Sequence, residues 1–149
     1  MHTIHTHVIN SAAPEYAEVF ALREEILRRP LGMSLHNEDL SRDHTDDIMV
    51  GKADGRVIAC LMLHHLDDGQ VQLRQMAVYN EWQGKGIGRQ LVAAAERYAA
   101  GKGYSTMVLH AREVAMGFYR SMGYRQVGDM YHEVGIPHYT MEKDLHASA

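Results

Sequence analysis

The sequence predicts a single mixed α/β domain over residues 1–149, on three observations. Of the 149 residues, 46% are hydrophobic and 23% are charged, a balance typical of a globular chain that builds a core without disulfides or a structural metal. Segments with the two-residue period of strands alternate with segments that have the 3.6-residue period of helices. Two Asp-Gly pairs, at 54–55 and 68–69, mark tight turns between strand-like runs, which predicts an antiparallel meander.

The first third of the chain is predicted to form a strand, a helix and an irregular segment. Residues 2–9 are rich in Thr, Ile and Val, which favour strands. After Pro14 the apolar side chains follow a helical spacing that ends near Pro30-Leu31-Gly32, and Arg28-Arg29 are expected to be surface charges. Residues 33–47 carry few large apolar side chains, so we expect a short helix or a mobile lid there, with the acidic residues of 38–47 on a solvated face.

The remainder of the chain is predicted to hold the rest of the sheet and two helices. The expected strands cover 48–52, 57–66, a run that begins after Gly69, 107–110, about 124–133 and 138–144. The expected helices run from Gly84 to Gly101 and up to Gly123, because a glycine suits the left-handed end of a helix. Gly135-Ile136-Pro137 should separate the last two strands.

One strand changes phase in its middle. The apolar residues hold odd positions at Val71 and Leu73 but even positions at Met76 and Val78. A β-bulge is the usual way in which a strand absorbs such a slip, so we predict one at 74–76; a strand buried on both faces is the alternative. A bulge would free backbone N–H and C=O groups and leave room for an extended molecule to bind there.

A glycine-rich turn follows this strand and leads into a helix. It reads Gln83-Gly84-Lys85-Gly86-Ile87-Gly88-Arg89. Glycines let successive N–H groups turn inward, and a helix N-terminus adds a partial positive charge, so the turn could cradle an anion such as a diphosphate. Its spacing excludes a Walker loop, because Lys85 is followed by Gly86, and it lacks the acidic partner of a dinucleotide fingerprint.

Three motifs together resemble the GNAT superfamily of acetyl-CoA-dependent N-acetyltransferases. The run Gln83–Gly88 is similar to the Arg/Gln-x-x-Gly-x-Gly/Ala signature of that family, and it follows a bulged strand as the family's signature does. The segment Ala115-x-x-Phe118-Tyr119-x-x-x-Gly123-Tyr124 is similar to the segment that, in this family, closes the slot for the acetyl-CoA cosubstrate. Gly135-Ile136-Pro137-His138-x-x-Met141 resembles the ElaA-like branch of small bacterial members. The resemblance covers about 48–144 and is thin before that.

The resemblance implies a GNAT-like fold and a binding slot for acetyl-CoA, the expected cosubstrate. The central, mostly antiparallel sheet would be bulged and splayed at its fourth strand and flanked by helices. The slot would lie between the bulged strand and the strand that ends at His110, with Tyr119 facing the sulfur. The other implied binding residues are Met76, Ala77 and Val78 for the pantetheine arm and thioester carbonyl, and Gln83, Gly84, Lys85, Gly86, Ile87, Gly88 and Arg89 around the diphosphate.

The resemblance also implies a direct reaction in a ternary complex. A neutral primary amine, on a small molecule or a protein, would attack the acetyl carbonyl while a bulge N–H stabilises the oxyanion. The Tyr119 hydroxyl would protonate the departing thiolate. His110, Glu133 and His138 lie near strand ends and are the candidates for the base, with water as the alternative. Many relatives have an Asn near the end of the strand before the tyrosine helix, whereas this chain reads His110-Ala111-Arg112-Glu113, so Arg112 or His110 substitutes or the contact is missing.

Composition bounds the partners and the location. A net charge of −4 argues against a nucleic-acid surface, and no apolar run is long enough to cross a membrane. The first residues lack the cationic and apolar regions of an export signal, and Cys60 is the only cysteine, so we expect a reducing, cytoplasmic location. Cys60 itself should be a buried, inert thiol. A homodimer, if one forms, is expected through the last strands.

Two other readings remain open at this point. Eleven histidines invite a metal-binding protein, but no carboxylate lies at a spacing that would complete a site, so no metal is expected. The other alternative is a non-catalytic acyl-CoA-binding module that senses or regulates. The intact Tyr119 favours the enzyme.

Overall fold

A computed structural model describes residues 3–145, which form two compact units. The first unit takes in the described residues up to His64 together with Leu73–Ala95, and the second takes in His65–Gln72 and the described residues from Glu96 onward. The described residues contain seven strands as well as helices, and the β1–β2, β2–β3, β5–β7 and β6–β7 pairs are antiparallel. This confirms the mixed α/β class with a mostly antiparallel sheet. One domain over 1–149 stays a prediction.

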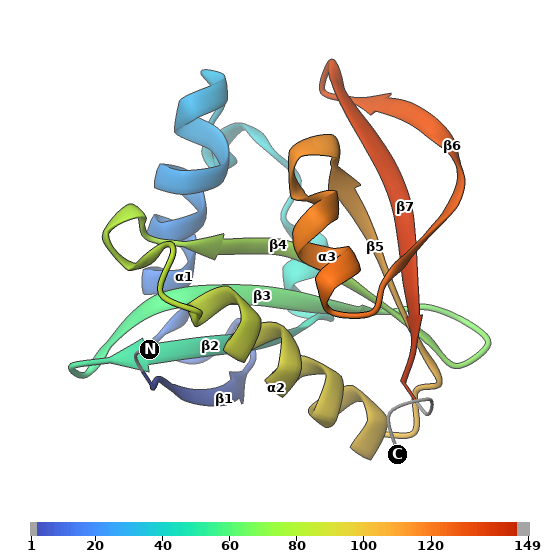
Figure 1. Cartoon of the computed structure of the whole chain (residues 1–149). Helices are drawn as coiled ribbons and strands as arrows, with labels where there is room; N and C mark the ends of the chain where they lie inside the picture. The colour runs from blue at the N-terminus through green and yellow to red at the C-terminus, as the bar shows by residue number, and fades with distance from the viewer. Residues whose placement is uncertain (1–2, 146–149) are drawn as a thin grey trace. The chain divides into compact units, whose positions relative to one another are not determined.

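The first unit is built on four strands in the order β1-β2-β3-β4 (Figure 1). Their bounds are His5–Ile9 for β1, Asp47–Ala53 for β2, Arg56–His65 for β3 and Gln70–Val78 for β4, of which the residues from Leu73 onward belong to this unit. Asp54 and Gly55 both have positive φ, at 53° and 77°, as a two-residue hairpin turn requires. The Asp-Gly prediction at this turn is therefore confirmed.

Helix α1 (Tyr16–Arg23) supplies the core of this unit on one side of the strands. The chain continues from α1 through a π turn, Glu24–Arg28, and a 3-10 turn, Arg29–Leu31, and Gly32 ends it with a φ of 69°. The predicted helix end at Pro30-Leu31-Gly32 is thus confirmed. The core it covers consists of Val19, Leu22, Ile9, Ile48, Val50, Val57, Cys60, Met62 and Ala77. Burying each large apolar side chain contributes about 1.5–3 kcal/mol.

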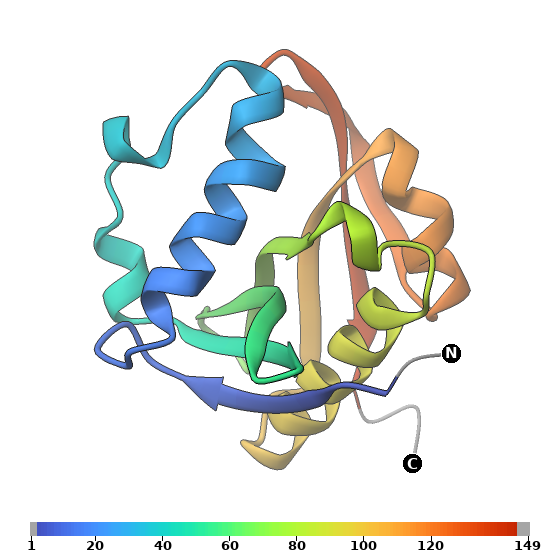
Figure 2. The same cartoon turned by 90° about the vertical axis from the view of Figure 1, so that its left-hand side faces the viewer.

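The segment between α1 and β2 differs from the expectation in one respect. It forms two short 3-10 helices, Leu35–Asn37 and Ser41–His44, and runs beside α1 (Figure 2). The acidic residues of 38–47 do not form a solvated face throughout, because Asp43 and Asp46 are only 1% and 2% exposed. The expectation failed there because the arginines that compensate these carboxylates come from α1 and β4, which local composition cannot reveal.

The second unit holds three strands in the order β5-β7-β6 (Figure 1). Their bounds are Thr106–Arg112 for β5, Arg125–Glu133 for β6 and Ile136–Asp144 for β7. A 3-10 turn, Glu113–Ala115, leads into α3 (Met116–Ser121), and Gly123 follows with a φ of 97°, as predicted. Helix α2 (Ile87–Gly101) begins in the first unit, and its residues from Glu96 onward belong to the second.

The turn between the last two strands is tighter than predicted. Val134 and Gly135 alone have positive φ there, at 47° and 73°, and Ile136 already pairs with Glu133. Pro137 therefore lies inside β7 rather than in the turn. It is tolerated because the β5–β7 ladder begins only at His138, so the missing proline N–H costs no hydrogen bond on that side.

Candidate active site

The predicted bulge is present in β4 at Gln75. This residue has a φ of 56°, a left-handed conformation that costs a non-glycine residue about 1–2 kcal/mol. Successive side chains of a regular strand point to opposite faces, yet the side chains of Arg74 and Gln75 both enter the same polar network beside α1. The phase slip read from the sequence is thereby confirmed.

The residues that follow the bulge return to the strand. Ala77 is 3% exposed and joins the core under α1, whereas Met76 and Val78 are half-buried. The Tyr79 amide donates to the Ile58 carbonyl at 3.1 Å, so β4 is again paired with β3 at its end. The short stretch 76–78 is therefore held at both ends, by the bulge and by this hydrogen bond.

The glycine turn fits an anion. After a 3-10 turn, Asn80–Trp82, the Gln83 side chain donates to the Val78 carbonyl at 2.8 Å and closes the loop on β4. Gly84 and Gly86 follow with φ of 75° and 79°, and a Cβ placed on Gly84 would meet no atom within 4 Å. Glycine is thus needed at 84 for its conformation rather than for close packing.

Helix α2 begins directly after these glycines. The Gln90 amide donates to the Gly86 carbonyl at 3.1 Å, so the amides of residues 87–89 precede this first bond of the helix. Lys85 Nζ lies 5.6 Å from the centre of the Trp82 ring, which keeps a cation at the turn. Amide donors, a helix N-terminus and a lysine suit a diphosphate, so the residues present fit the anionic part of an acyl-CoA.

Tyr119 lies in α3 of the second unit, among aromatic rings. It is 7% exposed and makes edge-on contacts with Phe118 and Tyr124, with ring centres 5.1 and 5.6 Å apart. Burial raises the pKa of Tyr119 to about 12, so its hydroxyl keeps its proton at neutral pH. The Tyr124 hydroxyl instead donates to Glu96 at 2.8 Å and has a structural partner.

The three candidate bases come together at one end of the second unit. Glu133 of β6 lies between two histidines: its Oε1 is 3.6 Å from His110 Nδ1 of β5, and its Oε2 is 3.4 Å from His138 Nε2 of β7. His138 is 6% exposed, and its Nδ1 lies 2.8 Å from the Ile136 carbonyl. The Tyr131 ring lies edge-on to His110. Arg112, offered in place of the missing asparagine, is the exposed last residue of β5.

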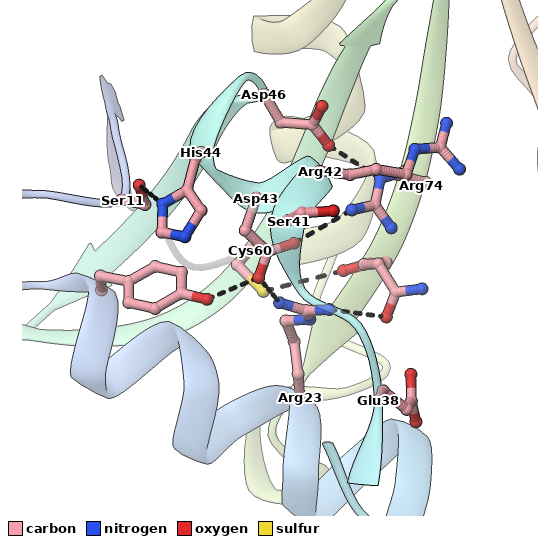
Figure 3. A network of polar contacts seen from close by, with 12 residues as sticks. Ser11, Arg23, Glu38, Ser41, Arg42, Asp43, His44, Asp46, Cys60 and Arg74 are labelled. Atoms are coloured by element: carbon pink, nitrogen blue, oxygen red, sulfur yellow. Dashed lines mark hydrogen bonds and ion pairs between the residues drawn. The ribbon is translucent and has the colours of Figure 1, made fainter. Parts of the chain in front are cut away.

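A buried polar network in the first unit was not predicted (Figure 3). Asp43 accepts from Arg23 Nη1 at 2.8 Å and from Arg74 Nη2 at 3.0 Å, and Asp46 accepts from Arg74 Nε at 2.8 Å. Arg23 is only 1% exposed. One signal in the sequence pointed to it: Arg23 falls four residues after Val19, on the face of α1 that is buried.

Two further predictions concern Arg28 and Cys60. The guanidinium of Arg28 donates two hydrogen bonds to Glu38, at 2.6 and 3.1 Å. The expectation that Arg28 is a free surface charge is therefore wrong. Cys60 is fully buried, as predicted, and burial raises the pKa of its thiol to about 12.

Within residues 3–145, no three His, Cys, Asp or Glu side chains are placed to hold a metal ion, and no helix is long and apolar enough to cross a membrane.

The fold and these sites define a class. A bulged fourth strand followed by a glycine turn at a helix N-terminus, in a mixed and mostly antiparallel α/β chain, is the arrangement of the acyl-CoA-dependent N-acyltransferases. The family model described as "Acetyltransferase (GNAT) family" matches residues 9–124, and the chain belongs to this family. It is accordingly an acyltransferase that transfers an acyl group from acyl-CoA to an amine.

Individual relatives agree with this assignment. The chain is 28% identical to the uncharacterized N-acetyltransferase YjcF of Bacillus subtilis over 139 residues, which are 92% of this chain and 98% of the relative. The crystal structure of Escherichia coli ElaA superposes with a TM-score of 0.83 at 19% identity, covering 95% of this chain and all of ElaA. A GNAT acetyltransferase of Elizabethkingia anophelis, solved with acetyl-CoA bound, has a TM-score of 0.71 at 17% identity and covers 97% of this chain and 99% of its own.

The family match bears on one of the readings left open by the sequence. Family membership favours the enzyme over a non-catalytic acyl-CoA-binding module. The likeness to ElaA confirms the GNAT-like fold that the three motifs together implied.

Proposed function

We propose that the protein transfers the acetyl group of acetyl-CoA to a primary amine, on a small molecule or a protein, by direct attack in a ternary complex. The observation that carries this proposal is the order of features in the first unit, where the left-handed Gln75 in β4 is followed by the left-handed Gly84 and Gly86 ahead of α2. Acetyl-CoA as the donor is supported by the related protein from Elizabethkingia anophelis that was solved with it.

Two segments of the first unit would bind the donor. The backbone of Met76–Val78 would hold the pantetheine arm and the thioester carbonyl, because this stretch directly follows the bulge. The residues from Gln83 to Arg89 would hold the diphosphate, through amides at the start of α2 and the charge of Lys85. A bulge amide would stabilise the negative charge that develops on the carbonyl oxygen.

Tyr119 would be the acid and the His110–Glu133–His138 cluster the base. The base takes a proton from the substrate ammonium, the neutral nitrogen attacks, and the N–C bond forms as the C–S bond breaks. Tyr119 gives its proton to the thiolate, and the second proton that the nitrogen loses on becoming an amide restores the tyrosine through solvent. The support is that Tyr119 holds its proton at neutral pH, and that Glu133 contacts both histidines.

Release of free CoA with a panel of amines tests the proposal. Acetyl-CoA is mixed with the protein and with small primary amines, polyamines, amino acids or peptides with a free amino terminus, and the thiol is measured. We expect CoA release that requires both protein and amine. Binding of acetyl-CoA without thiol release, with every amine tried, would contradict the proposed reaction and support a binding module.

A cytoplasmic location and a homodimer are proposals as well. The first is supported by Cys60 being the only cysteine, which excludes an internal disulfide framework, and cell fractionation would test it. Val127 and Met130 of β6, which are 40% and 44% exposed, support a dimer through the last strands. Light scattering on the purified protein would decide whether it forms.

A further inference from the structure

We propose that Gln75 is a positioning residue for acyl transfer: its side-chain carbonyl, gripped by Arg23 and Arg28, locks the bulge of β4 in its left-handed form. The lock fixes the direction of the peptide that follows, which carries the Met76 N–H. This inference rests on the proposed function, in which that amide lies beside the thioester carbonyl. It assigns a role to the side chain at the bulge.

Two guanidinium groups converge on one oxygen. Arg28 Nη2 donates to Gln75 Oε1 at 3.0 Å, and Arg23 Nη2 donates to the same oxygen at 3.4 Å. Both donors are charged, and hydrogen bonds from charged groups are the stronger kind. The Arg23 side chain is 1% exposed and that of Arg28 14%, so water competes little for either bond.

Each guanidinium is itself held in place, and Figure 3 shows the contact of Arg23 with Asp43. Arg23 donates to Asp43, and the same carboxylate accepts from Tyr16 at 2.5 Å and from Arg74. Arg28 is held by two bonds to Glu38. The two arginines that contact Gln75 are therefore fixed by residues of the chain itself, since each has a second, anionic partner.

The charges explain why the gripped side chain is an amide. The three arginines Arg23, Arg28 and Arg74 face the three carboxylates Asp43, Asp46 and Glu38, and His64 Nδ1 also lies 2.6 Å from Asp46 Oδ1. A carboxylate at 75 would add an unmatched negative charge to this mostly buried network. A neutral carbonyl oxygen can accept one N–H group from Arg23 and one from Arg28 without disturbing that balance.

The conformation of Gln75 shows that its side chain is used. If β4 needed only a bulge, glycine would adopt the left-handed form without strain. A glutamine with a φ of 56° is strained, and such strain persists only where surrounding contacts hold it. A left-handed residue also turns the next peptide away from the direction that a regular strand gives it, and the next peptide here carries the Met76 amide.

Substitution of Gln75 by methionine tests the proposal. Gln75→Met keeps the length of the side chain and the strain at this position but removes the acceptor. We expect kcat to fall by about 10- to 100-fold, as for a donor displaced by about 1 Å, with the Kd of acetyl-CoA changed less than about threefold. The matched control is Gln70→Met, the same change at the start of the same strand, which should leave kcat unchanged.

A readout other than activity follows the Met76 amide itself. In ¹⁵N spectra of the wild type, we expect the Met76 amide resonance to shift when acetyl-CoA is added, and to shift less in Gln75→Met at saturating acetyl-CoA.

A double-mutant cycle tests the link between Arg28 and Gln75. Arg28→Met should lower kcat when it is made in the wild type but much less when it is made in Gln75→Met, because part of its effect passes through Gln75. Additive losses in kcat would overturn that link.

Several results would overturn the positioning role of Gln75. Wild-type kcat and a wild-type Met76 shift in Gln75→Met would overturn the proposal, and so would a raised Kd with kcat unchanged. If Gln75→Met does not fold, Gln75→Gly replaces it, because glycine takes the left-handed form unstrained; we expect a reduced kcat, and wild-type kcat would overturn the lock. A wild type that binds acetyl-CoA but acetylates no amine would contradict the proposed function alone, and the Met76 shift would still test the positioning.

Discussion

The hydroxyl of Tyr119 is the general acid of the proposed reaction, and one substitution removes it. Replacing Tyr119 by phenylalanine removes the proton donor but keeps the ring and its contacts with Phe118 and Tyr124. We expect kcat to fall by about 10²- to 10⁴-fold, while the Kd of acetyl-CoA stays close to that of the wild type. Steady-state kinetics and calorimetric titration measure the two quantities.

Tyr124→Phe is the matched control for this change. Its hydroxyl donates to Glu96, so the variant should lose stability of about 1 kcal/mol while kcat is retained. An unchanged kcat in Tyr119→Phe would remove this residue from the reaction.

The pKa of Tyr119 makes a second prediction at the residue scale. Burial raises that pKa to about 12, so the acid stays protonated as the pH rises past the usual range for tyrosine, near 10. With amine and acetyl-CoA saturating, kcat should therefore show no alkaline fall below about pH 11. A pH profile of kcat measures this. A fall centred near pH 10 would mean that the acid is an ordinary exposed phenol or another group.

At the scale of elements, the glycine turn ahead of α2 can be separated from ordinary helix effects by two alanine substitutions. Gly84 has a positive φ and open space around it, so Gly84→Ala adds only backbone strain, about 1–2 kcal/mol. We expect the KM for acetyl-CoA to rise, because the turn relaxes away from the form that presents its amides. Kinetics with varied acetyl-CoA measure the change.

Gly101→Ala, at the end of α2, provides the comparison. A Cβ there also meets no atom within 4 Å, and the position is helical, so this variant should be more stable by about 0.5–1 kcal/mol with KM unchanged. If both variants raised KM equally, the conformation of the turn would not be the cause.

The link between α1, the acidic segment and β4 also belongs to this scale. Asp43→Asn removes the charge that compensates Arg23 and Arg74, and breaking a buried pair of this kind costs about 3–5 kcal/mol. We expect urea unfolding of this variant at a much lower midpoint. The exposed Asp129 offers the same substitution where no stability should be lost. Equal stability of the two variants would show that the network is not what holds this segment.

For the whole molecule, patterns that act locally were enough to predict most of the fold. The Asp-Gly turns, the helix ends at Gly32 and Gly123, and the phase slip at Gln75 each follow from the conformation of one or two residues. The site predictions at Tyr119 and in the glycine turn depended on resemblance, because a buried tyrosine or a glycine turn taken alone is more often structural.

The rest could not be predicted because it depends on partners far apart in the chain. Asp43 is buried only because Arg23 and Arg74 reach it, and no spacing rule connects the three. Likewise, Glu133 lies between His110 and His138 only because β7 pairs with both β5 and β6. Composition described these residues correctly as charged, but their surroundings were set by the topology.

The burial of Cys60 has a practical consequence for every assay that measures released CoA. Its sulfur lies inside the core under α1, and it is the only cysteine in the chain, so a thiol-reactive dye should find nothing to label on the folded protein. Each molecule of dye consumed would then count one turnover directly, and a slow background signal would report the fraction of protein that has unfolded.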